Sequence, residues 1–180
     1  MEFKNKNPKI YLISGKARSG KNLVSNIIFN EYQNKKCKKL SFAYYLKQYV
    51  KDISSWDGSD DTKPRDLLQK VGIDLLKNKI NNNFLINRIC EDIEVYSYFY
   101  DIIIITDVRL LDEIETIKNK YKNVISIRVN RNNDNNLTFE QQNHITETDL
   151  DNYDKFDYII ENTEDYNKLI IDTKKILEEE

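Results

Sequence analysis

The chain has 180 residues, a net charge of −2 and 32% charged side chains. This length fits a single domain around one hydrophobic core. The balanced charge argues against a strongly basic nucleic-acid-binding protein, and no apolar run reaches the roughly 20 residues that a membrane span needs. Residues 1–8 are polar and lack the apolar centre of a signal peptide. Cys37 and Cys90 have no metal-ligand spacing, so we expect free thiols in a reducing compartment.

Strand and helix patterns alternate along the first half of the chain. Lys9–Ser14 predicts a short apolar strand, and the spacing of apolar residues predicts a helix from Lys21 to about Tyr32. Lys38–Phe42 predicts a weaker strand, which a helix from Ala43 to about Ile53 follows. Next come a loop over residues 54–62, a helix from Pro64 with Leu67, Leu68, Val71, Leu75 and Leu76 on its apolar face, and a helix from Phe84 to about Tyr98.

The second half of the chain continues this alternation. Ile102–Thr106 is the most apolar run, and its lack of polar alternation predicts a parallel strand that is buried on both faces. It is followed by a predicted helix over Asp112–Tyr121 and a predicted strand over Val124–Val129. Next comes a polar segment from Asn130 to Asp154 without a convincing core face. The chain then continues with a strand over Phe156–Glu161 and a helix from Tyr166 to about Leu177. Together these elements predict an α/β fold with a doubly wound parallel sheet, whose ligands bind at the carboxyl ends of the strands.

The run Gly15–Asn22 predicts a phosphate-binding loop. In the pattern G-x-x-x-x-G-K-[ST], the glycines let backbone N–H groups point at phosphate oxygens, and the lysine reaches the β- and γ-phosphates. Gly15, Gly20 and Lys21 match this pattern, whereas Asn22 stands where Ser or Thr would bind Mg²⁺. The alternative is a purely structural turn. We favour the phosphate loop because the run follows a strand, opens a helix and carries extra positive charge, and we expect Lys21 to face ligand and pack against nothing.

Further polar residues stand at the end of the isoleucine strand. Asp107 is expected to hold Mg²⁺ or to polarise an attacking oxygen, with a helix cap or a turn as the alternative. Arg109, two residues later, would reach the same cleft, and its guanidinium group matches phosphate in a bidentate manner. We therefore expect Asp107 and Arg109 to belong to one site.

Two other pairs of residues are weaker candidates. Arg65 and Gln69 lie one helical turn apart and form either a substrate-facing surface or an ordinary solvated face. Arg128 and Arg131 flank the strand end that opens the polar segment, where arginines can stabilise a transferring phosphoryl group, and a solvated position is the alternative for each. His144, the only histidine, has no nucleophile partner in the sequence and is not assigned a catalytic role.

These segments together resemble a known family. The chain is similar to the phage-type deoxynucleoside monophosphate kinases, which also occur in bacteria, and more distantly to animal phosphomevalonate kinase. The resemblance rests on Ser14–Lys21, Lys63–Gln69, Thr106–Arg109, His144–Asp151 and Phe156–Asn162, in that order along nearly the whole chain.

The resemblance implies a single P-loop kinase domain over residues 1–180, of the three-layer nucleoside monophosphate kinase type with a five-stranded sheet. It implies an acceptor-binding helical region at about residues 43–98 and a lid at about residues 130–154. The implied reaction moves the γ-phosphoryl group of ATP, with Mg²⁺, to a nucleoside or deoxynucleoside monophosphate. The residues implied are Gly15, Lys16, Ala17, Arg18, Ser19, Gly20, Lys21, Asn22 and Asn162 for ATP, Arg65, Gln69 and Arg109 for the acceptor, Lys21, Asp107, Arg109, Arg128 and Arg131 for catalysis, and Asn22 and Asp107 for Mg²⁺.

Two departures keep other functions open. The family often has Asp at the position of Asn22, and it tends to read Phe-Ala-Asp where this chain has Phe42-Ala43-Tyr44. The alternatives are a kinase of another small phosphate ester, such as phosphomevalonate, and a nucleotide-binding regulatory protein without catalysis. Gln69 or the pair Tyr44–Tyr45 could hold a base. We expect small-molecule nucleotides as partners, and neither nucleic acid nor membrane. The expected location is the cytoplasm, or the host's cytoplasm if the protein is encoded by a virus. A homodimer is one possible oligomeric state.

Overall fold

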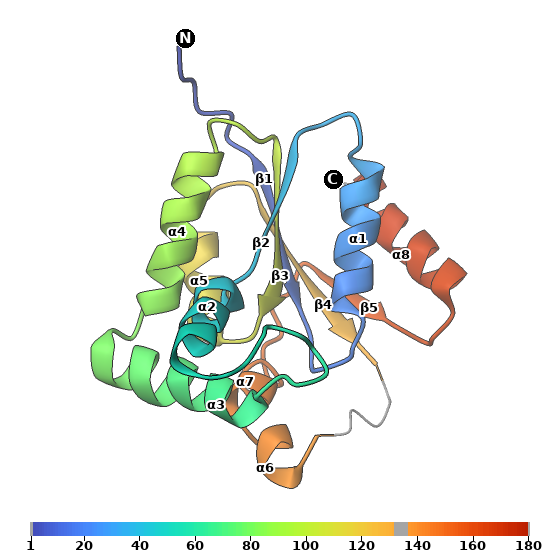
Figure 1. Ribbon diagram of the computed structural model, residues 1–180. Coiled ribbons are helices and arrows are strands. Elements are labelled where there is room, and N and C mark those ends of the chain that lie inside the picture. Colours follow the sequence, from blue (N-terminus) through green and yellow to red (C-terminus); the bar gives the residue numbers. More distant parts are fainter. Residues whose placement is uncertain (1, 132–136, 180) are drawn as a thin grey trace.

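Five parallel strands form the central sheet (Figure 1). The computed structural model describes residues 2–131 and 137–179. Within them the strands lie in the order β2-β3-β1-β4-β5, and each neighbouring pair is parallel, so the strands end at one edge of the sheet. Their bounds are β1 (Lys9–Ser14), β2 (Cys37–Leu40), β3 (Ile102–Val108), β4 (Val124–Asn130) and β5 (Tyr158–Glu161).

Helices cover both faces of this sheet. On one face α1 (Lys21–Glu31) packs against α8 (Tyr166–Glu179), and α4 (Phe84–Tyr96) and α5 (Leu111–Lys120) cover the other (Figure 1). Side chains of β3 alternate between the two layers, because Ile103 and Ile105 belong to the core under α4 and α5, whereas Ile102 and Ile104 pack under α1 and α8. The predicted parallel strand, buried on both faces, is therefore confirmed.

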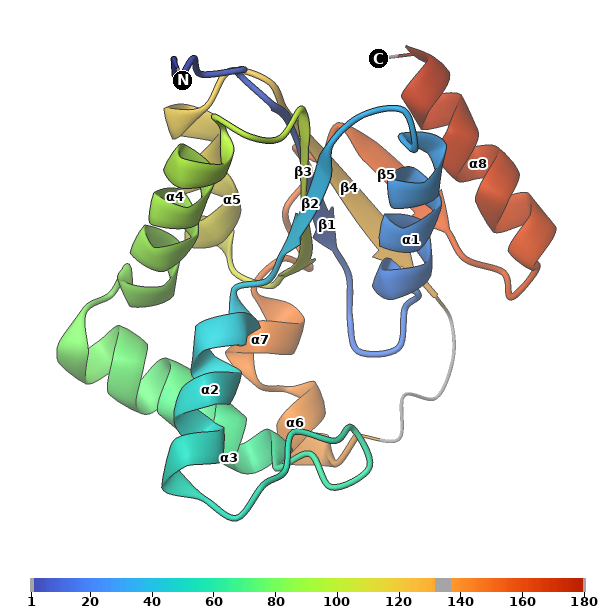
Figure 2. The same ribbon diagram turned by 45° about the horizontal axis from the view of Figure 1, so that its top comes forward.

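A smaller helical layer lies below the carboxyl edge of the sheet, as Figure 2 shows for α2 (Ala43–Ile53) and α3 (Arg65–Gln69). The helix predicted from Pro64 begins at Arg65 and continues as a π-helix, η1 (Lys70–Ile80), which ends where the Asn81 N–H donates to the Leu76 carbonyl five residues back. Leu75, predicted on the apolar face, is 42% exposed, because the wider helix departs from the 3.6-residue spacing. The layer has its own core of Val50, Trp56, Leu68, Val71 and Leu76.

The predicted lid contains two short helices, α6 (Phe139–Gln142) and α7 (Ile145–Thr148). Residues 132–136 of that segment lie outside the described residues. The expectation that the segment has no core face is wrong at Leu150, which is 3% exposed and belongs to the main core under α4 and α5. The segment is therefore anchored to the sheet at its C-terminal end. None of the helices in the described ranges has the length and hydropathy of a membrane span.

Candidate active site

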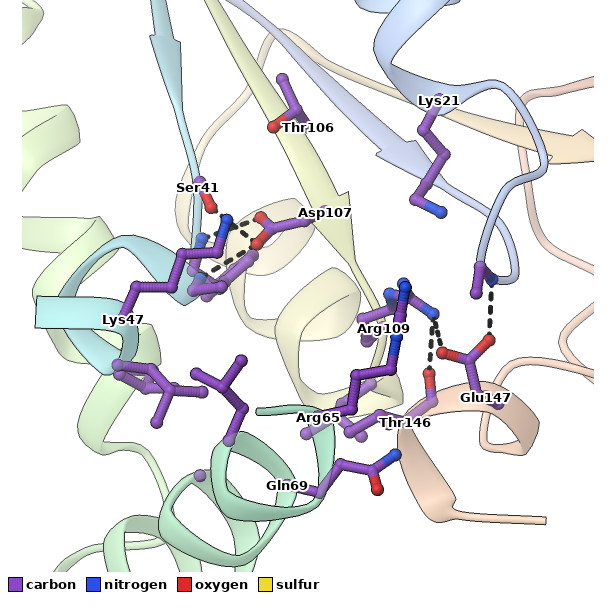
Figure 3. A pocket seen from close by; sticks show the side chains of 18 of the residues that line it. Lys21, Ser41, Lys47, Arg65, Gln69, Thr106, Asp107, Arg109, Thr146 and Glu147 are labelled. Carbon is purple, nitrogen blue, oxygen red and sulfur yellow. Dashed lines mark hydrogen bonds and ion pairs between the residues drawn. The ribbon is translucent and has the colours of Figure 1, made fainter. Parts of the chain in front are cut away.

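A cavity of about 930 Å³ opens at the carboxyl edge of the sheet, between the loop after β1 and the helices α2, α3 and η1 (Figure 3). It brings together predicted residues from the donor, acceptor and catalytic sets, namely Ala17, Arg18, Gly20, Lys21, Asn22, Arg65, Gln69, Asp107, Arg109 and Arg131. The predicted residues that do not line it are Gly15, Lys16, Ser19, Arg128 and Asn162. The cavity therefore joins the phosphate loop to the helical layer in one continuous space.

The backbone of the phosphate loop takes the curled conformation that its glycines allow. Gly15 has a φ of 148° and Gly20 a φ of 104°, both in the region that favours glycine. A Cβ on Gly20 would lie 2.4 Å from the amide nitrogen of Asn162, so the loop also needs glycine there for space. Arg18, with a φ of 60°, shares the left-handed conformation. The loop then enters α1 at Lys21, as predicted.

Lys21 is buried inside this loop, with 8% of the residue exposed. Its Nζ donates to the carbonyl oxygens of Gly15 at 2.8 Å and of Lys16 at 2.6 Å. Burial, and then the nearby charge of Arg109, lower the pKa of Lys21 to about 7. The expectation that Lys21 packs against nothing is therefore wrong. Because its ammonium group has lost hydration, an anionic phosphate beside it would stabilise the charged form.

Two predicted residues contact the phosphate loop or the strand end that precedes it. Arg128, on β4, donates to the Ser14 hydroxyl at 3.1 Å and pairs with Asp151 at 3.2 Å. Asn162 is buried and donates to the carbonyl oxygen of Ser19 at 2.9 Å. Both residues lie outside the cavity lining, so their contacts in this structure are with the protein.

Two buried polar atoms beside the loop have no hydrogen-bond partner in the part of the chain that the structure describes. They are the Oγ of Ser19 and the Nε of Arg131. The remaining nitrogens of Arg131 donate to the Arg18 carbonyl at 3.4 Å and pair with Glu164 at 2.6 Å. An unpaired buried donor is costly, and an anion bound at the loop would satisfy it.

Asp107 holds the turn between β2 and α2. Its carboxylate accepts hydrogen bonds from the Ser41 hydroxyl at 2.7 Å and from the N–H groups of Phe42 at 2.8 Å and Ala43 at 2.9 Å (Figure 3). The capping alternative therefore describes what Asp107 does in this structure. Three hydrogen bonds leave one acceptor direction of the two oxygens for a further ligand.

The side of the cavity that α2 and α3 line, which was predicted to bind the acceptor, carries polar groups without a partner among the described residues. Arg65 and Gln69 project from α3, and Lys47 reaches into the cavity from α2 (Figure 3). Across residues 2–131 and 137–179, none of these three side chains has a hydrogen-bond or ion-pair partner. The suggestion that Tyr44–Tyr45 hold a base is wrong for this structure, because neither tyrosine lines the cavity and Tyr44 is 57% exposed.

Three residues of the site escaped the sequence reasoning: Lys47, Glu113 and Glu147. Glu147 lies in the segment His144–Asp151, which contributed to the family resemblance. Its neighbours in the sequence are mostly polar, so nothing in the sequence indicated that it is buried. It pairs with Arg109, whose Nη1 also donates to the Thr146 carbonyl at 3.3 Å (Figure 3). Lys47 stands one turn into the helix predicted from Ala43, and that position was its only signal.

Glu113 fixes the backbone that carries Arg109. One carboxylate oxygen accepts from the N–H groups of Arg109 at 2.7 Å and of Leu110 at 3.0 Å, at the start of α5. Glu113 lines the cavity wall and is 6% exposed. Burial raises its pKa to about 8, although the two N–H groups and the charge of Arg109 oppose the shift.

The raised pKa of Glu113 predicts a stability difference that depends on pH. The folded protein holds a proton on Glu113 that the unfolded chain releases between pH 4.5 and about 8, so the stability that this group contributes is lost as pH rises through that window. We expect Glu113→Gln to match the wild type in melting temperature at pH 5 and to exceed it by about 3 °C or more at pH 9. Thermal unfolding at the two pH values measures this. Exposed Glu91→Gln is the control, and an unchanged difference between pH 5 and pH 9 would contradict the prediction.

Comparison with known proteins identifies the family. A family model described as deoxynucleotide monophosphate kinase matches residues 50–172, more than half of the chain. The chain belongs to the deoxynucleotide monophosphate kinase family. Among solved structures, TT1252 from Thermus thermophilus is similar over 96% of this chain and 97% of that chain, with a TM-score of 0.56 and 14% identity, which supports the fold alone. No curated protein matches the chain.

Family membership assigns to this kinase the ATP-dependent phosphorylation of a deoxynucleoside monophosphate. The matched region runs from within α2 into α8 and contains Arg65, Gln69, Asp107 and Arg109. The phosphate loop Gly15–Asn22 precedes that region, so its role is argued from its conformation and from the cavity that it lines.

Proposed function

We propose that phosphoryl transfer takes place inside the 930 Å³ cavity, from ATP on the phosphate loop to a deoxynucleoside monophosphate held by α3 and the end of β3. One observation carries this proposal: Lys21 of the loop and the two arginines Arg65 and Arg109 line the same cavity. Binding of a phosphate donor and of a phosphate acceptor both require cationic side chains. Here Lys21 comes from the phosphate loop, whereas Arg65 and Arg109 come from α3 and from the end of β3. Phosphoryl transfer needs mainly positioning and charge stabilisation, which this arrangement provides.

On the donor side, the N–H groups of the loop and the Lys21 ammonium group bind the ATP phosphates, and Lys16 and Arg18 add positive charge. The unpaired atoms of Ser19 and Arg131 supply further donors at the same place. Arg128 and Asn162 act on ATP indirectly. Their hydrogen bonds to Ser14 and Ser19 hold the conformation of the loop that binds the ATP phosphates.

On the acceptor side, Arg65 and Arg109 bind the phosphate of the monophosphate, and Gln69 hydrogen-bonds to the base. The same cavity has an apolar wall for a flat base, formed by Leu46, Leu68, Ile73, Leu76 and Phe84. These residues come from the region at 43–98, which we propose as the acceptor-binding region.

Asn22 and Asp107 are the residues that would hold Mg²⁺. Mg²⁺ in kinases keeps several waters and binds mainly phosphate oxygens with one or two protein groups. The Asn22 side chain lines the cavity and has no partner among the described residues, and Asp107 retains one acceptor direction, so this small donor set fits such an ion. The ion would neutralise charge on the ATP phosphates.

The lid that we propose is shorter than residues 130–154. Helix α6 has no buried residue and touches the acceptor helix through Gln141, which donates to Asp66 at 2.8 Å. Leu150 is fixed in the core. We therefore propose that α6 closes over the acceptor while the chain near Leu150 stays in place.

An acceptor panel tests the proposed function. Purified protein with ATP and Mg²⁺ is incubated with each deoxynucleoside and ribonucleoside monophosphate and with phosphomevalonate, and ADP and the new diphosphate are quantified. We expect at least one deoxynucleoside monophosphate to be converted faster than every ribonucleotide and faster than phosphomevalonate. ATP binding with no ADP formed from any acceptor would instead indicate a regulatory nucleotide-binding protein. Because ATP and nucleoside monophosphates are intracellular metabolites, we propose a cytoplasmic location.

A further inference from the structure

Glu147 is a buried carboxylate that lies between the phosphate loop and Arg109. Its side chain is 8% exposed. One oxygen accepts from the Ala17 N–H at 2.8 Å, and the other pairs with the Arg109 guanidinium group (Figure 3). Both contacts face the cavity that contains the proposed donor and acceptor sites. Burying a carboxylate is costly unless such partners satisfy it.

The two partners of Glu147 belong to different halves of the site. Ala17 is part of the loop that would bind ATP, whereas Arg109 follows β3 and would bind the acceptor phosphate. They are distant in sequence, and Glu147 lies 130 residues after Ala17. The carboxylate therefore links the proposed donor loop directly to the proposed acceptor arginine.

The backbone that carries Glu147 is itself held in place. The His144 ring caps α7 by accepting from the Thr146 N–H at 3.3 Å, and the Glu147 N–H donates to the His144 carbonyl at 2.8 Å. Asp149 accepts from the Leu111 N–H at 2.7 Å, which ties the end of α7 to α5. Because the Glu147 backbone is fixed, its carboxylate can hold the flexible Arg109 side chain in one orientation.

Arg109 needs such a partner to hold one orientation. An arginine side chain has large conformational freedom, and a fixed carboxylate removes most of it before ligand binds. The second arginine of the acceptor side, Arg65, has no ion-pair partner among the described residues, so it can adapt to the ligand. Arg109 is therefore held in one orientation before the ligand binds, whereas Arg65 can adjust to the bound ligand.

We propose that Glu147 is a positioning residue that sets the Arg109 guanidinium group against the phosphate loop, so that the acceptor phosphate is bound next to the donor. This inference rests on the proposed function. Glu147→Gln keeps one oxygen for the Ala17 N–H and turns an amide NH₂ toward Arg109. The variant therefore breaks the Arg109 contact and preserves the loop contact.

A double-mutant cycle with Glu147→Gln and Arg109→Ala tests the proposal. Affinity for the best deoxynucleoside monophosphate of the panel is measured by calorimetry, together with kcat and the KM of each substrate. We expect Glu147→Gln to raise the acceptor KM and Kd about tenfold in the wild-type background and less than about twofold beside Arg109→Ala, with the Kd of ATP changed less than about threefold. An equal loss of acceptor affinity in both backgrounds would overturn the proposal, because Glu147 would then act without Arg109.

Two further measurements keep the result interpretable. Glu147→Asp retains the charge, and we expect it to restore part of the acceptor affinity that the Gln variant loses; a loss as large as that of Gln would also count against the proposal. Thermal unfolding of the four ligand-free proteins of the cycle needs no substrate. If no acceptor is phosphorylated, the proposed function fails. The contact between Glu147 and Arg109 is then judged from thermal unfolding alone, and additive losses of melting temperature in the two single variants would overturn it.

Discussion

Replacing Lys21 with Met should lower kcat/KM for phosphoryl transfer about a thousandfold, the loss expected when a group that stabilises transition-state charge is removed. Lys21 is the cation placed inside the loop, between the carbonyl oxygens of Gly15 and Lys16. Burial and the nearby charge of Arg109 lower its pKa to about 7, so the protein around Lys21 disfavours its charged form. The negative charge of a transferring phosphoryl group would stabilise the charged form of Lys21. Methionine has no charge and cannot make this interaction.

The fold should tolerate the same change. Removing the ammonium group relieves a buried charge that is poorly solvated, and the unbranched methionine side chain fills most of the same space. We expect the melting temperature to change by less than about 4 °C. Exposed Lys168→Met on α8 serves as the matched control for activity. Wild-type turnover by the Lys21 variant would refute the assigned loop chemistry, and a collapsed melting temperature would show that Lys21 is required for folding instead.

The fold was predictable because its signals are local. The isoleucine run is buried on both faces of the sheet at Ile102–Ile105, as its lack of alternation indicated. The main strands and helices differ from the predicted bounds by no more than two residues at either end, which is within the usual uncertainty of such bounds. The π-helix η1 was missed because a spacing rule based on i+4 contacts cannot distinguish it from an α-helix.

The site was predictable only in part, for reasons of distance along the chain. The curled conformation of the Gly15–Asn22 loop was predictable because eight consecutive residues and the two flanking elements define it. Glu147 was missed because its partner in that loop is 130 positions away, and burial of a glutamate in a polar segment leaves no periodic signal. Asp107 was placed correctly at the strand end, yet only the structure reveals that Ser41 and the start of α2 use its carboxylate.

Replacing Gly15 with Ala should have the largest effect on stability among single-methyl changes in the loop. Its φ of +148° is a conformation that alanine rarely adopts, and the new Cβ would lie 2.4 Å from the carbonyl oxygen of Val129 and 2.5 Å from the Oγ of Ser19. The Ser19 side chain can rotate, but the Val129 oxygen belongs to the buried strand β4 and cannot move alone. We expect a loss of about 2–3 kcal/mol, or about 5–10 °C in melting temperature, together with lost ATP affinity.

Gly58→Ala separates backbone strain from steric clash. Gly58 also has a positive φ, +95°, but a Cβ there would meet mainly the Lys51 side chain, with its Nζ at 3.0 Å, and that flexible end can move away. We therefore expect Gly58→Ala to cost only the backbone strain, about 1 kcal/mol, and to leave ATP binding intact. Thermal unfolding and ATP titration of both variants test the comparison. Equal losses in the two variants would mean that strain alone matters, and that the contact between the phosphate loop and β4 is loose enough to admit a methyl group.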